Sequence, residues 1–214
     1  GAFVALIGPS GAGKTTIADL VLGVLEPDHG TVEIGSARPD AVRAASPGVI
    51  AYVPQKPGLV AGTISENIAL GVAPAELDHE RIAAVVGHAH LGALIESLPD
   101  GLDSSVGAHA DAVSGGQAQR IGIARALYPA PRLLVLDEAT SALDAGSEAV
   151  VAERLHELKG EVTVIVVAHR LSTVQRADVV HVVEDGRITA SGTFVEVRAA
   201  APMVEEYVRL MSFD

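Results

Sequence analysis

Short apolar runs alternate along this chain with longer stretches in which apolar residues recur at helical spacing. Three of the runs, at 3–7, 133–137 and 162–167, are almost continuously aliphatic, as is typical of strands buried on both faces of a parallel sheet. After the first run, apolar residues repeat at i, i+3, i+4, i+7 and i+8: Ile17, Leu20, Val21, Val24 and Leu25. This alternation predicts an α/β fold with a mostly parallel sheet that helices cover on both faces.

The alternation lapses in the middle of the chain. Three helical patterns separated by glycine or proline follow one another there, at 64–70, 77–86 and 91–98. We therefore expect a helical subdomain at 62–110, inserted into a core formed by 1–61 and 111–214.

The last part of the chain returns to short strands. Apolar runs at 179–183 and 187–190 flank Glu184-Asp185-Gly186, which is a hairpin signal. Helical periodicity then extends from 194 to 211.

A glycine-rich segment follows the first apolar run directly and matches the pattern GxxxxGK[ST]. Glycines are required because the backbone must wrap around phosphate oxygens and point successive N–H groups inward, in conformations that a Cβ hinders. Lys14 supplies a positive charge for the β- and γ-phosphates, the Thr15 hydroxyl is a ligand for Mg²⁺, and the N-terminus of the next helix adds partial positive charge. Together with Thr16, the predicted nucleotide-binding residues are Gly8, Pro9, Ser10, Gly11, Ala12, Gly13, Lys14 and Thr15.

The apolar run that begins at Leu133 ends in two adjacent carboxylates, Asp137 and Glu138. A strand that ends in charge beside a phosphate loop is a place where Mg²⁺ is held, so we expect Asp137 to bind Mg²⁺ directly or through water. An isolated pair of carboxylates at a strand end is more often simply exposed to water than bound to a metal. Its position between a Ser-Gly-Gly-Gln helix start and the segment ATSALD favours the metal site.

A helix is predicted to begin after Ser114. The apolar positions of this helix are Ile121, Ile123, Ala124 and Leu127. The helix is predicted to end at Pro129 and Pro131. Serine followed by two glycines at a helix N-terminus is an anion site that has no lysine of its own.

The run VSGGQ at 113–117, read together with LLVLDEATSALD at 133–144, resembles the ATP-binding cassette family, whose signature motif is usually written LSGGQ. The resemblance covers nearly the whole chain and implies a P-loop NTPase fold of the RecA-like type. It also implies that the signature residues bind the γ-phosphate of ATP held by a second nucleotide-binding domain, so that two domains enclose two nucleotides head to tail. These residues are Ser114, Gly115, Gly116 and Gln117.

The resemblance implies roles for further residues of an Mg-dependent ATPase. By this resemblance, Glu138 is expected to polarise the water that attacks the γ-phosphate. Gln55 corresponds to the Q-loop glutamine, whose amide reaches Mg²⁺ or that water, and His169 corresponds to the switch histidine that contacts the γ-phosphate. Ser141 and Asp144 fall in the D-loop. ATP and Mg²⁺ are the cofactors implied, and Glu138, His169 and Gln55 are the catalytic candidates.

Two segments resemble the cassettes of multidrug, lipid and peptide exporters, GTISENI at 62–68 and AHRLST at 168–173. They imply ATP-powered export, with a transmembrane domain as partner, fused upstream or separate, and a cassette on the cytoplasmic face of the membrane. Such exporters usually carry an acidic and a basic residue in the loop before the signature, as in VGERG, but 106–110 read VGAHA. The chain also begins at the strand before the phosphate loop, so we expect an N-terminally truncated cassette that lacks the family's first strands and its adenine-stacking aromatic residue.

Two other classes of protein share the phosphate loop but fit the rest of the sequence less well. A soluble cassette ATPase that acts as a conformational switch in DNA repair or translation has a long inserted coiled coil or two cassettes in tandem, and this sequence shows neither. A P-loop kinase leaves the SGGQ run and His169 without a purpose.

Composition limits the partners. A chain of 214 residues with 49% hydrophobic residues can bury a full α/β core, and the absence of cysteine suits a cytoplasmic protein. The net charge of −12 disfavours nucleic acid as a partner.

Overall fold

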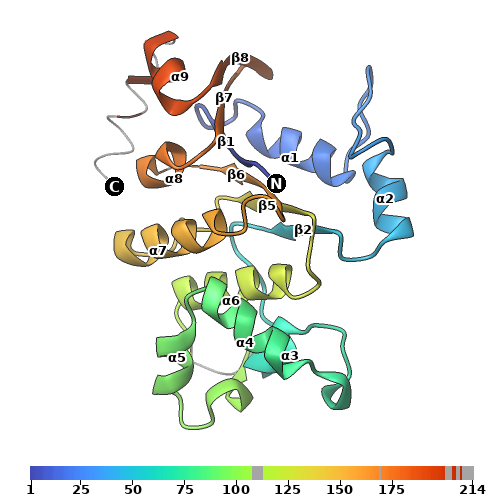
Figure 1. Ribbon diagram of the computed structural model, residues 1–214, viewed down its shortest axis with the longest axis vertical. Coiled ribbons are helices and arrows are strands. Elements are labelled where there is room, and N and C mark those ends of the chain that lie inside the picture. Colours follow the sequence, from blue (N-terminus) through green and yellow to red (C-terminus); the bar gives the residue numbers. More distant parts are fainter. Residues whose placement is uncertain (108–112, 169, 201–203, 206–207, 209–214) are drawn as a thin grey trace.

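The computed structural model describes residues 1–107, 113–168, 170–200, 204–205 and 208, and its centre is a six-stranded sheet (Figure 1). The strands stand in the order β2-β5-β6-β1-β7-β8. All neighbours are parallel except β7 and β8, so the predicted α/β fold with a mostly parallel sheet is confirmed. The strand bounds are β1 (Phe3–Ile7), β2 (Ile50–Val53), β5 (Leu133–Asp137), β6 (Thr163–Val167), β7 (Val179–Glu184) and β8 (Arg187–Gly192).

Helices cover both faces of the sheet because its central strands are apolar on both. In β5, Leu133 and Val135 pack in one cluster with α1 (Lys14–Leu22), whereas Leu134 and Leu136 belong to the larger core on the other face. The helices α6 (Gly115–Leu127) and α8 (Leu171–Gln175) contact β2 and β1, and α7 (Ala145–His156) contacts α8. Figure 1 shows α1 on one side of the strands and α7 and α8 on the other.

The first helix is shorter than its apolar periodicity indicates. Gly23 adopts a left-handed conformation with φ 64° and ends α1 after Leu22. The next apolar positions, Val24 and Leu25, therefore lie outside the helix and are 62% and 44% exposed.

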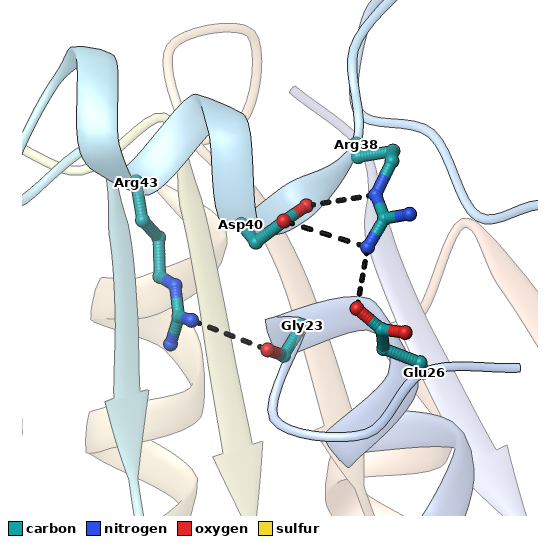
Figure 2. A network of polar contacts seen from close by, with 5 residues as sticks. All are labelled: Gly23, Glu26, Arg38, Asp40 and Arg43. Carbon is teal, nitrogen blue, oxygen red and sulfur yellow. Dashed lines mark hydrogen bonds and ion pairs between the residues drawn. The ribbon is translucent and has the colours of Figure 1, made fainter.

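A helix that the apolar pattern did not indicate, α2 (Pro39–Ala45), packs beside the end of α1. Arg38 forms ion pairs with Glu26 at 2.6 Å and with Asp40 at 3.1 Å, and Arg43 donates to the Gly23 carbonyl oxygen at 3.2 Å (Figure 2). Proline at its first position favours this helix start, because proline has no N–H to lose there.

The middle of the chain is helical, as predicted, and packs against α6. Its elements are β3 (Gly62–Thr63), α3 (Ile64–Ile68), the 3₁₀ turn η1 (Pro74–Glu76), α4 (His79–His88), α5 (Gly92–Ser97), η2 (Gly101–Asp103) and β4 (Ser105–Val106). β3 and β4 pair antiparallel, and the buried side chains of α3 and α4 join the same core as the sheet. In Figure 1 these helices lie at the opposite end of the molecule from β8. The subdomain boundaries stay a prediction, since 108–112 lie outside the described residues.

The predicted hairpin is present at β7 and β8. Its turn residues Asp185 and Gly186 both have positive φ, 48° and 74°, as a two-residue turn that matches strand twist requires. The helix α9 (Phe194–Ala200) follows and packs on both strands.

Candidate nucleotide-binding and catalytic site

The functional segments meet at one edge of the sheet because parallel strands carry them at their carboxyl ends. β1 leads into the phosphate loop at Gly8, β2 into Gln55 and β5 into Glu138. Val53 pairs with Leu136 in the ladder between β2 and β5, so Gln55 and Glu138 each lie two residues beyond a paired position. Ligands of open α/β sheets bind at this edge.

The shape of the phosphate loop depends on glycine. Gly8 has φ 147°, and a Cβ at this position would lie 2.0 Å from the carbonyl oxygen of Val183. Gly13, with φ 103°, stands directly before α1. The hairpin turn supports the loop, since the Gly186 N–H donates to the Ala12 carbonyl oxygen at 2.9 Å. Backbone contacts therefore hold the loop in place.

Lys14 is 6% exposed, and its Nζ donates to the carbonyl oxygens of Gly8 and Pro9, both at 2.8 Å. Burial lowers the pKa of the Lys14 ammonium, while the nearby carboxylates of Glu138 and Asp137 act in the opposite direction. A cavity of about 200 Å³ opens beside it, lined by Ser10, Gly11, Gly13, Lys14, Thr15, Thr16 and Glu138. A poorly hydrated ammonium next to an open cavity is well placed to contact phosphate oxygens.

Two predicted Mg²⁺ ligands lie next to each other. The Thr15 hydroxyl donates to Asp137 Oδ1 at 3.4 Å, and Asp137 is 7% exposed. Within the described part of the chain, no group of three or more His, Cys, Asp or Glu side chains could hold a metal ion. Mg²⁺ commonly takes one or two protein oxygens and completes its shell with water and phosphate oxygens, so this donor set fits an ion that arrives with a nucleotide.

Gln55 and Glu138 contact each other directly. Gln55 Nε2 donates to Glu138 Oε2 at 2.7 Å. Glu138 has φ 50°, in the left-handed region that residues with a Cβ rarely adopt, and such strained residues cluster at functional sites. The structure thus brings together two of the three catalytic candidates, beside the cavity that Glu138 lines.

The signature segment forms the start of α6, as predicted. Ser114 Oγ accepts from the Gln117 N–H at 3.3 Å and Gln117 Oε1 accepts from the Ser114 N–H at 2.6 Å, which is a capping box. Ser114 and Gly115 are exposed, whereas a Cβ on Gly116 would lie 2.9 Å from the Ala142 carbonyl oxygen. In the described part of the chain, no residue of the signature segment lines the phosphate-loop cavity. The segment therefore presents the N-terminus of α6 at a surface apart from that cavity.

The D-loop candidates lie between β5 and α7. Asp144 caps α7, because its Oδ1 accepts from the Ser147 N–H at 2.9 Å, and hydrogen bonds from the Ser147 side chain and backbone lower the pKa of Asp144. Ser141 Oγ accepts from Gln119 Nε2 at 3.4 Å. The third catalytic candidate, His169, lies outside the described residues, as do residues 108–110 of the loop before the signature.

Two buried polar side chains near these loops, Gln119 and Glu148, are not among the predicted site residues. They are 2% and 1% exposed. Gln119 stands four residues before Ile123 on the buried face of α6, and Glu148 stands four residues before Ala152 on the buried face of α7. A polar residue at an apolar helical position is the signal that could have identified them, because buried polar groups require hydrogen-bond partners.

The fold and this site define a P-loop nucleotide-binding domain, and comparison with known proteins identifies its family. A family model described as "ABC transporter" matches residues 1–141. The chain belongs to the ABC transporter family.

Two curated proteins are similar to this chain over its whole length. The chain is 43% identical over 215 residues to "ABC multidrug transporter MDR2" of Trichophyton equinum, which covers all of this chain and 16% of the relative. It is 41% identical over 219 residues to the "Mitochondrial potassium channel ATP-binding subunit" of Mus musculus, covering all of this chain and 30% of that protein.

A solved structure described as "Structure of a bacterial Atm1-family ABC exporter with ATP bound" matches with a TM-score of 0.86 and 34% identity, over 98% of this chain and 37% of that one. The chain therefore spans well under half the length of these relatives. Among the described residues no helix is long and apolar enough to cross a membrane.

Proposed function

We propose that this chain binds and hydrolyses ATP with Mg²⁺ and powers export through a transmembrane partner. The observation that carries the proposal is that Lys14 and Glu138 line one cavity beside the glycine-rich loop, while Asp137 lies close enough to act on the charge of Lys14. Lys14 contacts phosphate oxygens and the first turn of α1 adds its N–H groups. Glu138, held by Gln55, accepts a hydrogen bond from the attacking water and orients it.

Thr15 and Asp137 would hold the metal ion in this proposal. Gln55 is proposed as a further ligand on the basis of the family motif that it matches. Mg²⁺, when bound with the nucleotide, would offset the charge that develops on the phosphate oxygens. His169 is proposed to contact the γ-phosphate on the basis of the family motif that it matches.

We propose further that two nucleotide-binding domains enclose ATP head to tail. The signature residues Ser114, Gly115, Gly116 and Gln117 bind the γ-phosphate of the partner's nucleotide. Support comes from the exposed start of a 13-residue helix that does not line this chain's own cavity among the described residues. Ser141 and Asp144 lie close to that surface, since Gly116 packs on the loop that contains them.

The likeness to exporters supports a cassette that works at the cytoplasmic face of a membrane through its transmembrane domain. That domain is either part of the same polypeptide or a separate subunit. The acidic surface implied by a net charge of −12 supports a partner other than nucleic acid.

The test of hydrolysis replaces Glu138 by glutamine. Glu138→Gln keeps the size of the side chain but removes the charge that orients water, so phosphate release from Mg-ATP is expected to fall by about 10²-fold or more. ATP binding, measured as thermal stabilisation, is expected to persist. The matched control is Glu153→Gln, at an exposed position of α7, which is expected to turn over like the parent. A Glu138→Gln chain with parental turnover would remove Glu138 from this role.

A further inference from the structure

Gln119 is a neutral amide in the interior of the protein. It lies on α6, five residues after Ser114, and is 2% exposed, among apolar neighbours of the same helix such as Ile123. A buried primary amide costs free energy unless its two N–H donors and its oxygen find partners. The partners of Gln119 therefore indicate what the residue does.

All three polar groups of Gln119 reach loops of the proposed ATPase site. Its Nε2 donates to the backbone carbonyl oxygen of Gln55 at 2.8 Å and to Ser141 Oγ at 3.4 Å. Its Oε1 accepts from the Ala142 N–H at 3.0 Å. One side chain thus connects the Q-loop, 64 positions away in sequence, with the D-loop, 23 positions away at Ala142.

The Q-loop carries Gln55, and the D-loop begins in the turn that follows Glu138, so these two loops adjoin the two partners of the contact between Gln55 and Glu138. The Gln55 side chain donates to Glu138 Oε2 at 2.7 Å while Gln119 holds the Gln55 backbone. On the other side, the Ser141 N–H donates to the Glu138 carbonyl oxygen at 3.0 Å, so the turn after Glu138 is fixed where Gln119 binds it. A residue with φ 50° keeps that conformation only when surrounding contacts hold it, and Gln119 holds the turn that follows Glu138 through Ser141 and Ala142.

We infer that Gln119 is a positioning residue for ATP hydrolysis, which sets the Q-loop and the D-loop in one relative arrangement and so fixes Gln55 against Glu138. The inference rests on the proposed function of the site. Gln119 is not among the described residues that line the phosphate-loop cavity, and it acts through Gln55 and the turn after Glu138. Because Gly116 of the same helix packs on Ala142, α6 also connects the signature surface to this junction.

The first test is Gln119→Met, which keeps side-chain length and removes the three hydrogen bonds. We expect kcat for ATP to fall at least about tenfold, since misplacing a reacting group by a fraction of an ångström has effects of this order, while KM for ATP stays within about twofold. Lys14 and the phosphate loop, which bind the nucleotide, do not contact Gln119 in the described hydrogen bonds.

Asn67 offers a matched control, because it is also a buried amide with a full set of partners. It is 0% exposed, donates to the carbonyl oxygens of Val60 and Thr63, and accepts from the Val60 N–H and from Arg125. Asn67→Leu is expected to lower thermal stability as Gln119→Met does but to leave kcat near the parental value. Equal losses of kcat in the two variants would show a general effect of destabilisation and overturn the positioning role.

The second test, Gln119→Glu, distinguishes positioning from packing by its pH profile. A carboxylate retains the acceptor for the Ala142 N–H but has no donor for the Gln55 carbonyl oxygen, whereas a protonated carboxyl group has one. Burial favours the neutral form of a carboxyl group, so it is expected to titrate within the working range. The ratio of parental to variant kcat is therefore expected to be large at pH 8 and to narrow at pH 5.5.

The outcomes separate this inference from the proposed function. Suppose that the parent hydrolyses ATP. An unchanged kcat in Gln119→Met, or a ratio of parental to Gln119→Glu kcat that does not depend on pH, then overturns the role of Gln119 and leaves the ATPase assignment in place. A parent without ATPase activity overturns both. A reduced kcat with unchanged KM, absent from Asn67→Leu, supports the inference.

Discussion

Replacing Glu148 by alanine is expected to destabilise the chain more than any other removal of a single carboxylate described above. Glu148 is 1% exposed on α7, and its two oxygens accept from the hydroxyls of Ser172 and Thr173, the first at 2.8 Å. Arg170 Nη1 lies 3.7 Å from Glu148 Oε2, and Arg170 Nη2 donates to the Leu143 carbonyl oxygen at 2.8 Å. The carboxylate thus joins α7 and the D-loop to the segment that directly follows His169.

The magnitude follows from what the substitution leaves behind. Hydrogen bonds to a charged acceptor contribute about 1.5–3 kcal/mol each, and two hydroxyls lose theirs. Removing one partner of a buried ion pair costs about 3–5 kcal/mol. The Arg170 side chain is 21% exposed, so water partly compensates its charge. The hydrogen-bond and ion-pair figures both count the loss of the same carboxylate and are not added. We therefore expect a loss of about 3–4 kcal/mol, which is a large part of the roughly 5–15 kcal/mol that stabilises a typical domain.

The assay is urea denaturation of the parent and of Glu148→Ala, followed by circular dichroism. Glu153→Ala, on the exposed face of the same helix, is the control and is expected to change the free energy of unfolding by less than about 0.5 kcal/mol. A double-mutant cycle adds Arg170→Met, and the double variant is expected to lose less stability than the sum of the single losses, because no charge is then left without its partner. A Glu148→Ala loss below about 1 kcal/mol, or strict additivity in the cycle, would refute this account of the contact.

Two further predictions concern the signature surface and acid stability. Ser114→Arg places a bulky side chain at the exposed start of α6. In a chain that also carries Glu138→Gln, it is expected to abolish the ATP-dependent association measured by light scattering and to leave nucleotide binding nearly unchanged. Loss of nucleotide binding in the monomer would place the signature segment in the chain's own nucleotide site. Lys159 and the Phe3 N–H both donate to Asp178 and lower the pKa of its carboxyl group. The Asp178 carboxylate therefore stabilises the folded chain at neutral pH, and this stabilisation is lost as the pH falls below 3.8, the ordinary pKa of aspartate. Asp178→Asn is therefore expected to lower the free energy of unfolding at pH 7 by about 0.5–1 kcal/mol, and urea titrations are expected to show the difference narrowing below that value, whereas a constant difference would contradict the linkage.

Local features of the structure were predictable where one short segment carries the whole signal. The hairpin of β7 and β8 depends on the turn at Asp185-Gly186, and the start of α6 depends on the capping pair Ser114 and Gln117. The predicted first helix extends beyond the actual end of α1, because the apolar spacing continues through Leu25 whereas the backbone at Gly23 ends the helix. Periodicity reports which side chains can share a face and says less about where the backbone changes direction.

Taken by itself, the sequence determined the phosphate loop at Gly8 to Thr15, the carboxylate pair after Leu136, the signature segment and the alternation of strands and helices, since each is a pattern within a few consecutive residues. Only the tertiary structure decided that β2 lies beside β5, which places Gln55 against Glu138, and that Gln119 connects their two loops. The physical reason is that a hydrogen bond between residues far apart in sequence depends on strand order and helix packing. Those arise from the combined burial of many apolar side chains, and no short motif records them.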